Sequence, residues 1–335
     1  MTRFGIIGAS GIVGREINKL LIQKFKVPIT SIKLYASQQY LNPNIAPNIN
    51  YIKKFNINDL DNIDILFSCV NGDFSKKYTP EILKKYPNIK IIDNSSAFRY
   101  DDNIPLIVPE INGNILKKTD NLIANPNCTT AISVLALHPI NELFGINKVI
   151  MSTYQAASGA GKAGMEELMF ETKNYITKGK CDNNIFQYPL PFNIIPHIDK
   201  FQDNKYSNEE MKVVKETKKI LNNNDIKLSC TAVRIPTKRS HSMAITVETK
   251  NKIDYKKLYN YYNDLNDIIK IEDNIKDNKY PMPIISTKKN EIFVGRIRKS
   301  LIYEDYGCDL FVSGDQLLRG AALNSVLIAE KLINL

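Results

Sequence analysis

The sequence predicts an α/β protein with two domains: a doubly wound parallel sheet, followed by an α+β domain with a mixed or antiparallel sheet. Three observations support this prediction. Strand-like and helix-like segments alternate through the first third of the chain, as they do in parallel sheets with crossover helices. A glycine-rich turn joins the first strand to the first helix. After Cys128 the strands become longer and are separated by helices and long loops.

Short apolar runs mark the strands of the first domain, and segments with a helical apolar period mark its helices. The expected strands are Arg3 to Gly8, Ser31 to Ala36, Ile63 to Val70, Ile89 to Asp93 and Leu122 to Ala124. The expected helices are Ile12 to Phe25 and Phe74 to Lys85. Asn42 to Asn50, rich in asparagine and proline, is predicted as a loop.

The second domain opens with a predicted helix from Thr129 to Phe144. Its expected strands are Asn147 to Gln155, Ile226 to Ile235, Ser242 to Thr249 and Glu291 to Ser300. Gly179 to Tyr206 has almost no periodicity, and long loops of this kind usually serve binding or subunit contact. Asp315 to Leu335 is predicted as an amphipathic helix that returns to the first domain. We therefore assign residues 1–127 and 315–335 to the first domain and residues 128–314 to the second.

Composition limits the class of protein. The chain has 335 residues, 43% hydrophobic and 24% charged, which suits two ordinary globular domains. No apolar stretch approaches the length that spans a bilayer, and the N-terminus shows no export signal, so we expect a cytoplasmic protein with no membrane partner. The five cysteines show neither zinc-site spacing nor a disulfide framework, so we expect free thiols and no metal.

The net charge of +10 and the pI near 9.1 raise nucleic acid as a partner. However, the lysines are scattered among asparagines and aspartates, without a dense run or the interleaved aromatic residues of a stacking platform. We therefore expect a solvated basic surface and no nucleic-acid partner.

The segment Gly5-Ile-Ile-Gly-Ala-Ser-Gly-Ile-Val-Gly places glycines at positions 5, 8, 11 and 14, between the first strand and the first helix. Glycines at such a turn let a pyrophosphate approach the helix N-terminus closely. The spacing departs from the strict G-x-G-x-x-G pattern, so a tight turn without a ligand is the alternative. After the second strand, Tyr35-Ala-Ser-Gln-Gln offers no acid to a ribose 2′-hydroxyl, which favours NADP over NAD.

Cys128 lies in Ala-Asn-Pro-Asn-Cys-Thr-Thr, at the predicted start of a helix. The free amides and positive end of a helix favour the thiolate over the thiol, so Cys128 is the candidate nucleophile. Of the three histidines, His138 falls inside the same helix and His197 in the long loop, where structural roles are favoured. His241 is predicted in a strongly basic loop between two strands, where nearby cations keep it neutral, as a base for the thiol requires.

Three separated motifs resemble the aspartate-β-semialdehyde dehydrogenase family: Asn125-Pro-Asn-Cys-Thr-Thr, Tyr154-Gln-Ala-Ala-Ser-Gly-Ala-Gly and Arg234-Ile-Pro-Thr-Lys-Arg-Ser-His. The likeness covers essentially the whole chain. It implies a Rossmann-type first domain and a second domain like that of glyceraldehyde-3-phosphate dehydrogenase. It also implies NADPH-dependent reduction of aspartyl phosphate to aspartate semialdehyde, with release of phosphate, for the biosynthesis of lysine through diaminopimelate and of threonine, methionine and isoleucine.

The resemblance also implies roles for individual residues. Cys128 would form a thioester, His241 would act as acid/base, and Gln155 would orient the substrate and the thiol. Arg234 would hold the substrate α-carboxylate and Glu209 its ammonium group, with Glu210 as the alternative. Arg99 and Lys212 would bind phosphate. The residues that would contact the cofactor are Gly8, Ser10, Gly11, Ile12, Val13, Ser37, Gln38, Gln39, Ser158, Gly159 and Gln316.

Gln39 departs from the family pattern, because members commonly carry an arginine in this register to grip the 2′-phosphate. NAD is therefore an alternative cofactor to NADP. The resemblance further implies a homodimer or homotetramer, joined through the second domain's sheet and the loop from Gly179 to Tyr206. Two other functions are the alternatives. One is N-acetyl-glutamyl-phosphate reductase or a related phosphorylating aldehyde dehydrogenase; the substrate of that reductase has no free ammonium and needs no partner for one. The other is a dinucleotide sensor, which needs no Cys128.

Overall fold

The computed structural model describes residues 2–38 and 52–335. The chain divides into two compact units, Met1–Asn127 with Ala321–Leu335, and Cys128–Gly320. The second boundary falls later than the one drawn from the sequence at residue 315. Residues 315–320 belong to the second unit because Asp315 binds Arg239 there and Gly320 packs directly against Cys128.

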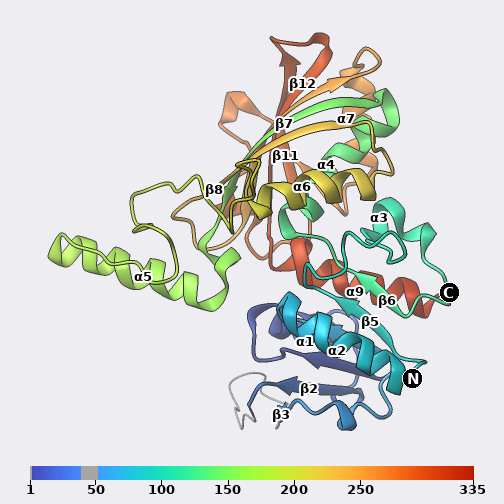
Figure 1. Cartoon of the computed structure of the whole chain (residues 1–335). Helices are drawn as coiled ribbons and strands as arrows, with labels where there is room; N and C mark the ends of the chain where they lie inside the picture. The colour runs from blue at the N-terminus through green and yellow to red at the C-terminus, as the bar shows by residue number, and fades with distance from the viewer. Residues whose placement is uncertain (1, 39–51) are drawn as a thin grey trace. The chain divides into compact units, whose positions relative to one another are not determined.

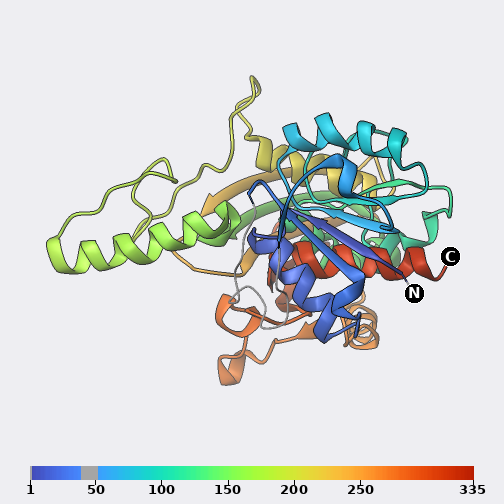
Figure 2. The same ribbon diagram turned by 90° about the horizontal axis from the view of Figure 1, so that it is seen from below.

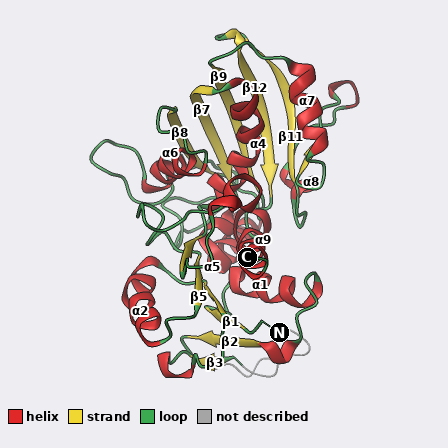
Figure 3. Ribbon diagram, turned by 90° about the vertical axis from the view of Figure 1, so that its right-hand side faces the viewer, coloured by secondary structure: helices red, strands yellow, loops and turns green. Residues whose placement is uncertain are grey.

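The sheet of the first unit is entirely parallel, which confirms the doubly wound prediction (Figure 3). Its strand order is β3-β2-β1-β4-β5-β6. The strands are β1 (Phe4–Ile7), β2 (Ile32–Ala36), β3 (Lys53–Lys54), β4 (Ile65–Ser68), β5 (Lys90–Asp93) and β6 (Leu122–Ala124). The order reverses between β1 and β4, and ligands of such sheets bind outside the carboxyl ends of the strands at this point.

Helices lie on both faces of this sheet. They are α1 (Ile12–Gln23), α2 (Gly72–Lys85), α3 (Pro109–Asn112) and α9 (Leu323–Ile333). α1 and α9 pack against each other on one face, while α2 covers the other (Figure 3). The C-terminal helix thus returns to the first unit, as predicted, but begins later than residue 315. Asp315 instead accepts the amides of Leu317 and Leu318 and forms a turn ahead of the helical segment.

The second unit contains a mixed sheet with the order β10-β11-β12-β9-β7-β8. The strands are β7 (Ile146–Gln155), β8 (Lys227–Arg234), β9 (His241–Thr249), β10 (Ile269–Ile271), β11 (Ile292–Ser300) and β12 (Glu304–Gly314). The sequence did not predict β12, because its first half is charged and contains a glycine. Cys308 is buried within this strand.

One face of the mixed sheet is covered by α4 (Cys128–Phe144), α6 (Asn208–Ile220) and α7 (Tyr255–Asp264). α8 (Pro283–Ser286) is a single turn beside β12. α5 (Gly161–Lys178) and the loop that follows it extend away from this sheet (Figures 1 and 2). In the described part of the chain, no helix is long and apolar enough to cross a membrane.

The loop after α5 contains no α-helix or β-strand, as predicted, yet it is anchored to α5. The Glu167 carboxylate accepts the amides of Asn184 and Ile185 at 2.9 and 2.7 Å. Large apolar side chains stand exposed along this arm, among them Phe170, Ile176, Tyr188 and Phe192. Such a row of apolar residues is typical of a surface that contacts another protein.

Ser207 and Glu210 form a capping box at the start of α6. The Ser207 hydroxyl accepts the Glu210 amide, and the Glu210 carboxylate accepts the Ser207 amide at 2.6 Å. The second Glu210 oxygen accepts the Ala232 amide of β8 at 2.9 Å. Because both oxygens bind backbone amides, Glu210 joins α6 to the mixed sheet and serves the fold.

Replacing Glu210 with alanine is expected to lower the free energy of unfolding by about 2–4 kcal/mol, since two buried backbone amides lose their acceptor. Urea unfolding followed by circular dichroism measures this change. The exposed Glu166 on α5 provides the control, and its alanine variant should stay within about 0.5 kcal/mol of the parent. If the free energy of unfolding changes equally in the Glu210 and Glu166 variants, Glu210 has no structural role.

Candidate active site

Three predicted site residues meet at one edge of the mixed sheet because of its strand order. Gln155 ends β7 and Arg234 ends β8, and the two residues are partners in the parallel register of these strands. His241 begins β9, which runs antiparallel to β7, so its first residue lies beside the end of β7. All three side chains are buried. The strand pairing therefore gathers an amide, a guanidinium and an imidazole.

His241 is neutral in this site. Burial, together with the positive charge of Arg234, lowers the pKa of His241 to about 3. The Ala156 amide donates to its Nδ1 at 3.1 Å, which assigns the remaining ring proton to Nε2. His241 was expected in a loop as a base for the thiol. It instead opens a strand, and Nε2 presents an N–H donor.

Gly159 packs against both basic side chains. A Cβ atom at this position would lie 2.5 Å from Nη1 of Arg234 and 3.4 Å from the His241 ring. The Arg234 Nη1 also donates to the Ala156 carbonyl at 2.6 Å. The turn after β7 thus fixes the guanidinium and the imidazole through its backbone.

Arg234 is a buried cation near two groups that can carry negative charge. Burial lowers its pKa, while the charges of Glu209 and Cys128 act in the opposite direction. Its guanidinium carbon lies 5.7 Å from the centre of the Phe186 ring. Arg234 therefore stands within electrostatic reach of both the acid and the thiol of the site.

Cys128 is the first residue of α4 and is partly exposed. The first turn of α4 carries no acidic residue that would neutralise the positive end of the helix. A Cβ atom at Gly320 would lie 2.9 Å from the Cβ of Cys128, so only glycine fits there. The sequence prediction of a helix beginning at this thiol is confirmed.

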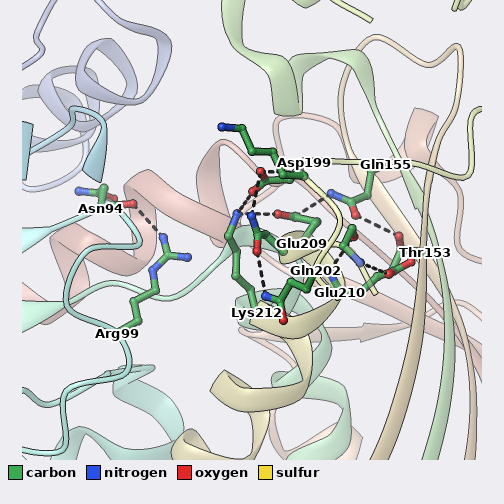
Figure 4. Close-up of polar contacts among 12 residues, drawn as sticks. Asn94, Arg99, Thr153, Gln155, Asp199, Gln202, Glu209, Glu210 and Lys212 are labelled. Atoms are coloured by element: carbon green, nitrogen blue, oxygen red, sulfur yellow. Dashed lines mark hydrogen bonds and ion pairs between the residues drawn. The ribbon is translucent and has the colours of Figure 1, made fainter. Parts of the chain in front are cut away.

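A chain of polar contacts crosses the site from β7 to the loop before α6 (Figure 4). The Thr153 hydroxyl donates to Oε1 of Gln155 at 3.0 Å, and Nε2 of Gln155 donates to Oε1 of Glu209 at 3.1 Å. The Lys212 ammonium then donates to Oε2 of Glu209 at 3.1 Å and to Oδ2 of Asp199 at 2.8 Å. Glu209, unlike Glu210, thus faces the predicted site residues.

Lys212 and Asp199 form a partly buried ion pair. Burial alone would lower the pKa of Lys212, but the charge of Glu209 and the bond to Asp199 raise it above its ordinary value. Burial would likewise raise the pKa of Asp199, yet hydrogen bonds from Lys212 and the Lys200 amide lower it. Lys212 is therefore fully charged and held by two carboxylates.

Gln316 and Ser158, both predicted to contact the cofactor, are joined to each other. Nε2 of Gln316 donates to the Ser158 hydroxyl, and Oε1 accepts the Ser240 amide at 2.8 Å. Ser240 directly precedes His241. The structure thus joins these two predicted cofactor contacts to the backbone just before His241.

The turn between β1 and α1 forms a cradle that fits a dinucleotide pyrophosphate. Gly8 has a φ of +81°, and a Cβ atom there would lie 2.2 Å from the Cys69 carbonyl oxygen. Gly11 caps α1 without a side-chain hydrogen bond, and the first turn of α1 has no acidic residue. The helix amides are therefore open to an anion.

The other predicted residues of the first unit surround this turn or the end of β5. Ser10 lies in the turn before α1, Ile12 and Val13 lie in the first turn of α1, and Ser37 and Gln38 are exposed after β2. Gln39 lies outside the described residues. Arg99 is buried, and it donates from Nε to the Asn125 carbonyl and from Nη2 to the Asn94 carbonyl, both at 2.9 Å.

The sequence did not predict two residues of this chain of polar contacts, Thr153 and Asp199. Thr153 lies two positions before Gln155 on the same face of β7, so strand alternation could have indicated it. Asp199 lies in the irregular loop and has a left-handed φ of +68°. No local pattern in the sequence marks it.

Family models match both units of the chain. Residues 3–119 match the NAD binding domain of semialdehyde dehydrogenase, and residues 137–319 match the semialdehyde dehydrogenase dimerisation domain. The first unit is thus a domain of the type that binds a nicotinamide dinucleotide, and the second is of a type that forms dimers.

Curated relatives and solved structures agree with these models. The aspartate-semialdehyde dehydrogenases of Aquifex aeolicus and Campylobacter jejuni are 40% and 39% identical to this chain, each aligning 99% of it and 98% of their own length. The structure of aspartate semialdehyde dehydrogenase II from Vibrio cholerae complexed with ASA is 34% identical, with a TM-score of 0.90 over 100% of this chain and 98% of its own. The chain therefore belongs to the aspartate-semialdehyde dehydrogenase family.

Proposed function

We propose that the protein reduces L-4-aspartyl phosphate to L-aspartate 4-semialdehyde with NADPH, and catalyses the reverse, phosphate-dependent oxidation. One observation carries the proposal. A thiol at the positive end of α4 shares its surroundings with a guanidinium, a carboxylate, an amide and a neutral imidazole. The names of the curated relatives and the Vibrio cholerae complex with ASA support the same substrate.

Arg234 and Glu209 account for the amino-acid end of the substrate. A guanidinium fork matches a carboxylate, and the buried Glu209 carboxylate matches an ammonium group. Both oxygens of Glu210 bind backbone amides, which favours Glu209 for this role. N-acetyl-glutamyl-phosphate reductase acts on an acylated amine, for which a buried carboxylate at residue 209 would be unsuitable. The site therefore favours a free amino acid.

Cys128 supplies the covalent step. Its sulfur attacks the acyl carbon of aspartyl phosphate, the carbon–oxygen bond to phosphate breaks, and phosphate leaves with the bonding electrons, giving a thioester. A nicotinamide held by Ser158, Gly159 and Gln316 would supply the hydride that reduces this thioester carbon. The carbon–sulfur bond then breaks, which releases the aldehyde and returns the thiolate to the positive end of α4.

His241 and Gln155 serve the reacting oxygen and the acyl group. Because Nδ1 accepts the Ala156 amide, the Nε2–H of His241 is a donor for the oxygen that becomes negative during the reaction. Gln155 is held at both ends of its amide by Thr153 and Glu209, so it is oriented before substrate binds. Arg99 and Lys212 are the proposed phosphate ligands.

NADP is the proposed cofactor, with NAD as an alternative. The cradle of Gly8 and Gly11 suits either pyrophosphate. Ser37 and Gln38, together with Gln39, would receive the 2′-phosphate without an acid nearby to repel it. Ser158, Gly159 and Gln316 would contact the nicotinamide end. The relative from Candida albicans, solved with NADP, shares the fold at 21% identity and a TM-score of 0.72.

A homodimer or homotetramer is the proposed assembly. The uncovered face of the mixed sheet carries Ile150 and a stacked pair of rings, Tyr154 and Phe311, whose centres are 6.0 Å apart. Together with the exposed apolar residues of the arm after α5, this face supports subunit contact through the second domain.

Replacing Cys128 with alanine should lower kcat on the order of 10⁴-fold or more while NADP binding stays near normal, since the cradle of the first unit is untouched. Phosphate-dependent reduction of NADP by aspartate semialdehyde measures turnover, and fluorescence titration measures binding. Appreciable activity in this variant would rule out the thioester route.

Replacing Arg234 with alanine should lower kcat/KM for aspartate semialdehyde by an amount equivalent to about 2–5 kcal/mol, because the buried guanidinium no longer contacts the substrate α-carboxylate. Lysine at this position should recover only part of the loss, since it lacks the planar fork. The exposed Lys162 on α5 is the control, and its alanine variant should behave like the parent. An Arg234 variant with unchanged kcat/KM would remove Arg234 from the substrate site.

Replacing Gln39 with arginine should raise the ratio of kcat/KM for NADP to that for NAD on the order of tenfold, through a charge-assisted contact to the 2′-phosphate. Side-by-side assays with the two cofactors measure the ratio. No change would show that this side chain does not reach the phosphate.

A further inference from the structure

Lys212, a proposed phosphate ligand, has its charge committed to two carboxylates. Its ammonium lies 3.1 Å from Glu209 and 2.8 Å from Asp199, and its side chain is only 18% exposed (Figure 4). Glu209 in turn is the residue assigned to the substrate ammonium. Glu209 therefore binds Lys212 in this structure and is also the proposed partner of the substrate ammonium.

We propose that the Glu209–Lys212 pair couples the two substrates, so that phosphate binds tightly only after an amino-bearing aldehyde has displaced Lys212 from Glu209. This coupling rests on the proposed function. In the free protein Lys212 neutralises the buried Glu209. When the substrate ammonium reaches Glu209, it neutralises this carboxylate in place of Lys212 and repels the lysine. The N–H donors of Lys212 then turn toward phosphate.

The surroundings of Glu209 limit where a second cation can bind. Its side chain is 8% exposed, Oε1 accepts from Gln155, and Oε2 accepts from Lys212. Removing Lys212 without a replacement would leave a buried carboxylate with one cation fewer nearby, which is costly. The substrate ammonium is the replacement cation. An aldehyde without an ammonium leaves the Glu209–Lys212 ion pair intact.

Asp199 is a positioning residue that holds Lys212 in the site while the lysine leaves Glu209. Its Oδ1 accepts the Lys200 amide at 2.7 Å, and its backbone is held in a left-handed conformation with φ +68°. Its Oδ2 retains the lysine when Glu209 releases it. Lys212 thus stays in the site and remains charged while it exchanges one partner.

Binding linkage makes the coupling reciprocal. If the substrate ammonium strengthens phosphate binding by a given factor, phosphate strengthens binding of the amino-bearing aldehyde by the same factor. The affinity for phosphate then reports whether the amino group has been recognised. Succinate semialdehyde, which has the same carbon chain without the amino group, is the probe that separates the two cases.

The experiment measures the phosphate Kd by calorimetry in Cys128→Ala protein loaded with NADP and saturated with either aldehyde. The Cys128 variant removes turnover, so the titration reports binding alone. Phosphate is expected to bind at least about fivefold more tightly beside aspartate semialdehyde than beside succinate semialdehyde. Equal dissociation constants would overturn the coupling.

A second variant tests the residue that carries the effect. Adding Glu209→Gln should free Lys212 with either aldehyde, so phosphate should bind equally tightly beside both, near the stronger parental value. Adding Glu166→Gln, which removes the carboxylate of an exposed lysine pair on α5, should keep the parental difference. If the difference survives Glu209→Gln, another residue causes it. The parental comparison stands by itself if that variant does not fold.

The outcomes separate this proposal from the proposed function. If the wild-type protein turns over aspartate semialdehyde with phosphate, but phosphate binds equally tightly beside both aldehydes, the coupling is wrong and the proposed function stands. Absence of that turnover sinks the function itself.

Discussion

The positive end of α4 is the feature on which the account of this site depends. Cys128 occupies the first position of the helix, and no acidic side chain in the first turn opposes the helix field. Arg234 adds a second positive charge within electrostatic reach of the sulfur. His241 is buried and neutral, with Nδ1 accepting a backbone amide. Under the proposed function, fixed positive charge and not a histidine base would therefore stabilise the thiolate.

The mixed sheet brings other residues of the proposed substrate site together. Its register sets Gln155 beside Arg234, and the antiparallel return of β9 brings His241 to the same edge. α6 adds Glu209, and the capping box of Ser207 and Glu210 fixes the start of that helix against β8. The fold therefore places opposite charges together where little water reaches them, so their geometry governs which ligand can enter.

Much of this arrangement could be predicted from the sequence, and the failures have physical causes. Apolar runs and helical periods indicated the parallel sheet, α1, α2, α4 and most of the mixed sheet, because burial imposes those patterns. They missed β12, whose first half is charged, and they put His241 in a loop. Asp199 was missed because a left-handed loop residue acquires its partners only through tertiary structure. Glu209 and Glu210 are adjacent in the sequence, and only their tertiary contacts give them different partners.

The rate at which iodoacetamide alkylates Cys128 near pH 7 tests the central claim most directly, since only the thiolate reacts. The two other partly exposed cysteines, Cys69 and Cys181, are replaced by serine, and a simple peptide thiol serves as the reference. The account predicts alkylation at least about tenfold faster than the reference, with the excess retained when His241 is replaced by asparagine and lost when Arg234 is replaced by methionine. A rate equal to that of the peptide thiol would contradict it.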